Sequence, residues 1–351
     1  MTMPATPRAI VTIERTGFSS TDGRGLVKYD SWNTKRLIKE VDVELVTDAS
    51  SQGKVTFFDP HFKVIDAFSD ATAKAVVKIY LGYGQDLGEP VFKGVLAEVE
   101  RDQKDTVFTC FDMAFVMKLE KKAAYKNGKN RLTIIKELVE RNGLKFEGPE
   151  TPLKLEADKV TMQDQQTDWE HVMELAHDDG LKIFVRQDTV FAKYPAKVGV
   201  PIMTVRPPKD KDLLEGWQFT YHTLESQDGK PKVVKHRRRG KAGRRAEGQS
   251  NLTTKAEVSH LNFKQDVASP SNSKLSKRAQ AQKELEREHP FEGRVEFLFP
   301  VSRKRPEVRD TIAVEGIGKL HSGSYIGDTV NYNFSPGRLS MDLDLYRDIN
   351  I

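Results

Sequence analysis

Alternation of apolar and polar residues dominates the first hundred positions and predicts β-strands. Residues 41–45 alternate one by one, as a strand with one buried face does. Residues 74–81 and 91–100 follow the same pattern, and the glycine-rich residues 82–88 between them have the composition of a turn. We therefore expect a long hairpin here, followed by a further short strand over residues 106–111.

The hydrophobic spacing changes in the middle of the chain, where it predicts two helices. The first covers residues 131–142, with Asn130 as its N-cap. The second covers residues 168–179, because Thr167 and Glu170 have the spacing of a capping box. Trp169 lies on the apolar face of the second helix and is expected in a core. A strand pair over residues 181–185 and 189–194 follows and completes an α+β unit.

The last third of the chain returns to strand patterns, and we expect Trp217 to lie in its core. The predicted strands cover residues 216–222, 294–299, 311–315, 325–334 and 339–345. One helix, residues 274–288, interrupts them. Its large apolar residues are Leu275 and Leu285, which is too little for a buried face, so it is expected to be solvated or to pack lightly on a partner.

These patterns predict a mainly β protein with an α+β part. They place an α+β domain between two β domains. The expected boundaries are 1–115 for the first β domain, 116–196 for the α+β domain and 197–351 for the second β domain. A chain of 351 residues is long enough for two or three domains.

Composition narrows the function classes. No run of about eighteen apolar residues exists, so no membrane helix is expected. The first fifteen residues do not resemble a secretory signal. The single cysteine, Cys110, excludes a disulfide within one chain and fits folding in a reducing cytoplasm. The net charge of +5 is small, and most of the excess lies in one segment.

The sequence contains no motif that positively supports catalysis or metal binding. The glycines of residues 82–88 precede a strand, whereas phosphate binding requires a helix at that point. His171 and His177 are six residues apart, which places them on different sides of a helix, and we read His177 and Asp179 as solvated. We therefore predict a non-enzymatic protein with no catalytic residues, no cofactor and no metal.

The basic segment over residues 236–245 is the sharpest local feature. Its charged residues are Arg237, Arg238, Arg239, Lys241, Arg244 and Arg245. Glycines at 240 and 243 indicate a loop, and no aromatic residues are interleaved for base stacking. A solvated loop is the simplest interpretation. The functional alternative is a contact with nucleic acid or with an acidic neighbouring protein.

Several stretches, in this order, resemble the phage late-control D proteins and related baseplate hubs, which are similar to the hub part of the VgrG spike proteins. They are LGYGQDLG (81–88), VFKGVLAEVE (91–100), TDWEHVMELA (167–176), GLKIFV (180–185), DTIAVEG (310–316) and GSYIGDTV (323–330). Relatives carry a histidine near the position of Tyr332, and the basic segment is not part of the family pattern.

The resemblance implies that the β domains 1–115 and 197–351 are tube-forming and β-barrel-like. It also implies a structural role in a phage tail or a related injection machine that is assembled in the host cytoplasm. Three chains with two similar β domains each would form six near-equivalent positions, which adapts a six-fold tail tube to a three-fold spike. The implied partners are two further copies of the chain, the tail tube protein, a spike or tip protein and the tape-measure protein, with transient contact to passing DNA. The implied location is the tail baseplate of the virion. Two alternatives remain: a nucleic-acid-binding protein that uses the basic segment, and a tail-associated cell-wall hydrolase.

Overall fold

The computed structural model of the protein describes most of the chain. The described residues are 6–15, 26–32, 37–66, 75–127, 130–149, 160–179, 181–193, 199–210, 214–221, 233–237, 245–249, 266–268, 291–298 and 305–347. The predicted helix over residues 274–288 lies outside them.

The first stretch of the chain is β-rich, as its alternation predicts. Its elements are β1 (Pro7–Arg15), β2 (Leu26–Asp30), β3 (Ile38–Val46), β4 (Gln52–Phe58), α1 (Lys63–Asp66), β5 (Ala75–Tyr83), β6 (Phe92–Arg101) and β7 (Asp105–Asp112). The predicted hairpin is confirmed, because β5 and β6 pair antiparallel across the glycine-rich turn.

The middle of the chain forms the predicted α+β unit. Its elements are η2 (Met113–Lys118), β8 (Lys121–Asn127), α2 (Arg131–Arg141), β9 (Lys145–Glu147), β10 (Val160–Thr167), α3 (Asp168–Asp178), β11 (Lys182–Arg186) and β12 (Thr189–Lys193). Asn130 caps α2 and Thr167 caps α3, both as predicted. Trp169 is buried in the core that α2, α3 and β11 share.

The remaining elements include the five strands predicted for the last third of the chain, together with four strands and a short helix that the patterns do not predict. They are β13 (Met203–Val205), β14 (Leu214–Tyr221), β15 (Val233–Arg237), β16 (Arg245–Gln249), β17 (Asp266–Ala268), β18 (Phe291–Leu298), β19 (Thr311–Val314), α5 (Gly318–His321), β20 (Gly323–Ser335) and β21 (Arg338–Arg347). β15, β16 and β17 form a separate small sheet.

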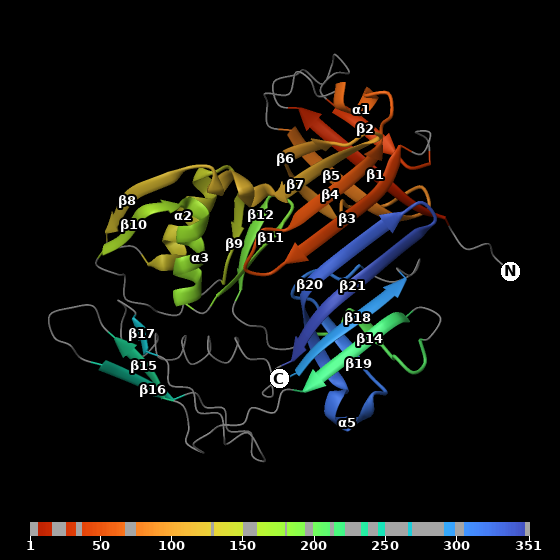
Figure 1. The fold of residues 1–351 in the computed structure, drawn as a ribbon. Coiled ribbons are helices and arrows are strands. Elements are labelled where there is room, and N and C mark those ends of the chain that lie inside the picture. The colour runs from red at the N-terminus through yellow and green to blue at the C-terminus, as the bar shows by residue number, and fades with distance from the viewer. Residues whose placement is uncertain are drawn as a thin grey trace.

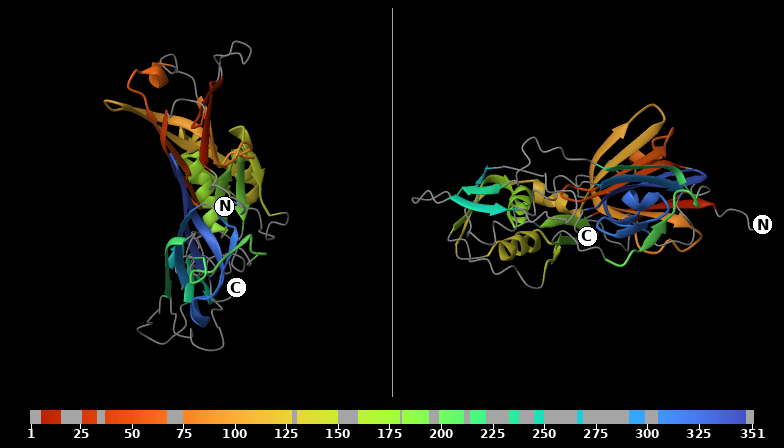
Figure 2. Two further views of the ribbon diagram at one scale, coloured as in Figure 1. Left: turned by 90° about the vertical axis from the view of Figure 1, so that its right-hand side faces the viewer. Right: turned by 90° about the horizontal axis from the view of Figure 1, so that it is seen from below.

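Among the described residues, thirteen strands from both ends of the chain form one continuous sheet. The junction is an antiparallel pairing of β20 with β3, in which Val330 lies opposite Leu45 and Tyr332 opposite Val43. Figure 1 shows the blue strands β20 and β21 running alongside the orange-red strand β3, and Figure 2 shows the two ends of this elongated sheet. The prediction of a mainly β fold is confirmed.

Each half of the sheet curls so that distant strands share a core. Tyr29 of β2 contacts Phe57 of β4 with ring centroids 4.8 Å apart, although several strands separate β2 from β4 in the sheet order. In the other half, Phe219 of β14 lies 5.3 Å from Tyr325 of β20. One hydrophobic cluster extends through both halves, so the division into domains 1–115 and 197–351 remains a prediction.

The α+β unit is attached where the two halves of the sheet meet. Asp48, in the turn between β3 and β4, accepts hydrogen bonds from the Ile183 amide at 2.9 Å and from the Lys182 ammonium at 2.8 Å. Arg186 of β11 forms an ion pair with Glu307 and donates to the Val308 carbonyl. These contacts connect the α+β unit to both halves of the sheet.

Two predicted side-chain environments are wrong. Asp179 is not solvated, because it is buried in an ion pair with Arg131 of α2, at a nitrogen–oxygen distance of 2.8 Å. Trp217 is not in the core, because it lies on β14, the last strand of the sheet, with 50% of its surface exposed. Alternation of apolar and polar residues locates a strand, but it does not show whether that strand lies at the edge of a sheet or between two others.

The capping box of α3 provides a test of the α+β unit. The Thr167 hydroxyl accepts from the Glu170 amide at 3.1 Å, and the Glu170 carboxylate accepts from the Thr167 amide at 2.8 Å. Thr167→Ala should lower the free energy of unfolding by about 1 kcal/mol. The measurement is urea unfolding followed by tryptophan fluorescence, to which the buried Trp169 contributes.

The matched control for this test is Thr133→Ala. Thr133 is exposed inside α2, where alanine is at least as good a helix former, so the change should stay within about 0.5 kcal/mol. Equal effects of the two substitutions would show that the capping box contributes nothing.

Candidate functional site: the polar face of the sheet and the repeated strand unit

The structure brings the two ends of the predicted basic segment together. Arg237 ends β15 and Arg245 begins β16, and the two residues lie opposite each other in an antiparallel pair. The other predicted contact residues, Arg238, Arg239, Lys241 and Arg244, lie outside the described residues. The partner-contact role of this segment therefore remains a prediction.

The polar face of the continuous sheet is strongly acidic across eight consecutive strands, from the edge strand β14 to the second half of β6. Paired residues of neighbouring strands point to the same face, so the registers place its side chains in common rows. We define the acidic face as Glu40, Asp42, Glu44, Glu98, Glu100, Glu292, Glu296, Asp342 and Asp344. The basic residues paired with members of this set are Lys54, opposite Asp42, and Arg294, opposite Asp344.

Burial and neighbouring like charges raise the pKa of two carboxyl groups on this face. Partial burial raises the pKa of Asp342, and Glu296, which lies directly opposite, raises it further. Burial is also the main cause of the raised pKa of Asp42, with a contribution from Glu40. At neutral pH these carboxylates are charged, and their charge lowers the free energy of unfolding. The acidic face is therefore not explained by a contribution to the stability of the fold.

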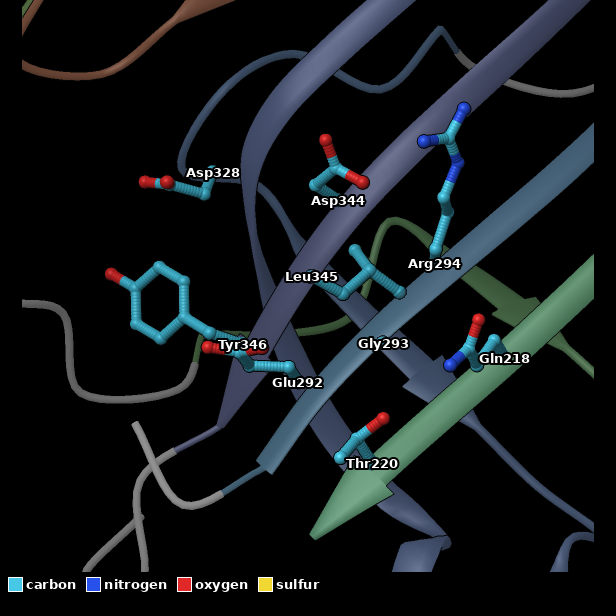
Figure 3. A pocket seen from close by; sticks show the side chains of 9 residues that line it. All are labelled: Gln218, Thr220, Glu292, Gly293, Arg294, Asp328, Asp344, Leu345 and Tyr346. Carbon is cyan, nitrogen blue, oxygen red and sulfur yellow. The ribbon is translucent and has the colours of Figure 1, made fainter. Parts of the chain in front are cut away.

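An open pocket of about 310 Å³ lies at the end of the acidic face (Figure 3). The side chains of Gln218, Arg294 and Asp344 project there from the neighbouring strands β14, β18 and β21. Arg294 is held by Glu296 at 3.0 Å and lies 3.7 Å from Asp342. The pocket is therefore lined by carboxylates and one guanidinium on the surface of the sheet.

In the part of the chain that the structure describes, no group of three or more histidine, cysteine or acidic side chains is arranged to hold a metal ion. No helix among the described residues is long and apolar enough to cross a membrane.

The two halves of the sheet repeat one strand arrangement. The spatial order is β1-β5-β6-β7-β4-β3 in the first half and β13-β19-β20-β21-β18-β14 in the second. When each set is numbered along the chain, both orders read 1-4-5-6-3-2. Two differences exist: β2 has no counterpart, and β13 pairs parallel with β19, whereas β1 pairs antiparallel with β5.

Irregularities in the ladders repeat at equivalent places, which fixes the alignment residue by residue. The β6–β7 ladder shifts between Leu96 and Glu98, and the β20–β21 ladder shifts between Gly327 and Thr329. The β3–β4 and β14–β18 ladders shift in the same way, between Ile38 and Glu40 and between Leu214 and Gly216. Bulges are specific features of a fold, so their coincidence indicates two copies of one unit.

The alignment uncovers a short sequence repeat that the hydrophobic patterns alone do not single out. It matches QGKVTFF at residues 52–58 with EGRVEFL at residues 292–298. A Cβ atom on Gly53 would approach the Phe92 ring to 2.9 Å, and one on Gly293 would approach the Phe219 ring to 2.4 Å. Both glycines thus leave room for an aromatic side chain.

Solved structures with the same fold are phage tail proteins and a secretion component. A tail protein of Neisseria meningitidis MC58 aligns with a TM-score of 0.69 and 10% identity over 97% of both chains. The 43 kDa tail protein of prophage MuSo2 from Shewanella oneidensis gives 0.62 and 9% identity over 96% of both chains. A type VI secretion component of E. coli, described as similar to the T4 tail proteins gp27 and gp5, gives 0.56 and 9% identity over 88% of this chain and 73% of that one.

The Glu296–Asp342 pair provides a test of the acidic face. The raised pKa of Asp342 means that the folded protein holds this proton more tightly, so stability is lost as the pH rises above about 4. Asp342→Asn should therefore raise the free energy of unfolding by about 0.5 kcal/mol at pH 7–8. Below about pH 3 the carboxyl is mostly neutral in both states, and the difference should vanish. A destabilised variant at pH 8 would contradict this account.

Sequence comparison assigns the family. No curated protein matches the chain. The family model described as the Alg8 N-terminal domain matches residues 70–335. The structural neighbours show a phage tail-type fold, and membership of the late-control D family remains a prediction. Because the matching family model covers more than half of its length, the chain belongs to the Alg8 N-terminal domain family.

Proposed function

We propose that this protein is a structural hub of a phage tail baseplate or a related injection machine. Three copies form a ring that joins a six-fold tail tube to a three-fold spike. The repeated strand unit is the observation that carries the proposal, because a chain with two equivalent units supplies six equivalent positions in a trimer. The shared fold with phage tail proteins and a type VI secretion component supports the same role.

The partners follow from this geometry. The six-fold side of the ring binds the tail tube protein, and the three-fold side binds the spike or tip protein, with the tape-measure protein in the bore. The protein acts without enzymatic chemistry and belongs to the virion tail. Tyr332, where late-control D relatives carry a histidine, is buried and donates to the Pro306 carbonyl at 2.6 Å, which is a packing role.

The acidic face lines the channel in this proposal. DNA carries a dense negative charge, and a wall of carboxylates repels it instead of binding it. Repulsion over roughly one Debye length, about 8 Å in physiological salt, keeps the polymer away from the wall during passage. The energetic cost of crowded carboxylates is then explained by the need for a wall that does not bind DNA.

The first test is the mass and shape of the purified protein. Light scattering at micromolar concentration should give about three times the chain mass of 39.7 kDa. Negative-stain images should show a ring with a central hole. The ring should persist at micromolar concentration, because permanent interfaces bury on the order of 2,000 Å² or more. A monomer, both alone and with tail-tube protein, would refute the hub assignment.

The second test concerns the basic segment, which we propose contacts an acidic neighbouring protein of the tail. In the variant, all six of its arginine and lysine residues, from Arg237 to Arg245, are replaced by serine. The variant should keep its oligomeric mass and lose salt-sensitive binding to tube or spike protein. Duplex DNA binding with a log–log salt slope of about −5, abolished in the variant, would instead favour the nucleic-acid alternative.

A further inference from the structure

The junction inside the chain shows how two units of this fold join. The second half of β20, residues 329–334, pairs with β3, residues 41–46. The apolar side chains of both paired strands are buried: Val330 and Tyr332 are 0% and 2% exposed, and Val41 and Val43 are 0% and 1% exposed. The first half of β20, in contrast, pairs with β19.

The strands equivalent to these two form no such pair within the described residues. β6 corresponds to β20, and its first half pairs with β5, but its second half has β7 as its partner on one side only. β14 corresponds to β3, and it is the last strand of the sheet. Val99, the equivalent of Val330, is 38% exposed, and Trp217, the equivalent of Val41, is 50% exposed.

We propose that β14 of one copy pairs antiparallel with the second half of β6 in the next copy and thereby closes the ring. This inference rests on the proposed function and names the surface that performs it. The junction inside the chain fixes the register: Val99 lies opposite Tyr221, Glu100 opposite Thr220, and Arg101 opposite Phe219. Junctions within and between chains then alternate around the ring.

The chemistry of the two edges suits this pairing. On the apolar side, Val99 meets a row formed by Trp217, Phe219 and Tyr221. Phe219 and Tyr221 are half-buried against the core of their own chain, whereas Trp217 is exposed, and large exposed aromatics are typical interface anchors. On the polar side, Glu100 faces the neutral Thr220, so no two carboxylates are opposed. Unpaired strand edges recruit further strands, and a head-to-tail contact of this kind forms a ring when its rotation closes.

Cysteine cross-linking tests the register. Glu100→Cys with Thr220→Cys places two thiols opposite each other on the polar face, away from the apolar row. After mild oxidation, non-reducing gels should show covalent dimers and trimers and nothing larger. Each single variant should remain uncross-linked. Native Cys110 should not interfere, because it is buried and its burial raises the pKa of its thiol.

The repeat offers a matched control pair. Glu44 is the equivalent of Thr220, but its position is already paired with Asn331 inside the chain. Glu100→Cys with Glu44→Cys should therefore give no cross-linked oligomers. Glu44→Cys with Asn331→Cys should form a disulfide within one chain that leaves the gel mass monomeric.

A second variant keeps the test informative if a cysteine pair folds poorly. Trp217→Asp should weaken the trimer at least about tenfold by light scattering over a dilution series. Leu119→Asp is the control, since Leu119 is similarly exposed at the end of η2 in the α+β unit and lies on neither edge strand. A Trp217→Asp protein that stays trimeric at every concentration would overturn the inference.

The outcomes separate this inference from the function on which it rests. A wild-type trimer without cross-links in the Glu100–Thr220 pair overturns the β6–β14 interface and leaves the hub proposal intact. A monomeric wild-type protein overturns both. Cross-linked species larger than a trimer would show the pairing without closure and would overturn the ring.

Discussion

The pairing of β20 with β3 is the constraint on which the rest of the structure depends. It satisfies two strand edges that would otherwise expose their backbone groups, and it does so between segments almost three hundred residues apart. Through this pairing the hydrophobic cluster becomes continuous, the acidic face extends across both halves, and the α+β unit finds both of its attachment points side by side. Loss of the pairing would separate all three features.

The two faces of the sheet have opposite effects on stability. The inner face buries large apolar side chains and supplies the favourable free energy. The outer face sets carboxylates against each other, as at Glu296 and Asp342, which costs free energy at neutral pH. A stable core therefore permits an outer face whose charge serves another purpose, and natural proteins commonly give up some stability at functional surfaces in this way.

The sequence predicts local structure well and long-range pairing poorly. Alternation locates β3, β5, β6 and β21 within a few residues, and the caps at Asn130 and Thr167 locate both helices, because these signals act between near neighbours. The order of strands in the sheet has no local signal. Trp217 is misassigned for the same reason, since an edge strand alternates like a central one. The match of QGKVTFF with EGRVEFL was available in the sequence, but it becomes recognisable only when the strand registers align the two segments. The acidic face likewise consists of residues from distant strands, and most of the basic segment lies outside the described residues.

The two repeats differ in how their second and third strands are connected. In the first repeat a short turn joins β3 to β4, and its Asp48 holds the α+β unit. In the second repeat the equivalent connection, between β14 and β18, spans residues 222–290 and carries the basic segment. A ring of three chains would therefore present this long connection at every other position and the α+β unit at the remaining ones. Duplication of the strand unit, followed by different insertions in the two copies, would turn a six-fold arrangement of units into a three-fold one. Two kinds of attachment point would then alternate along one rim of the ring.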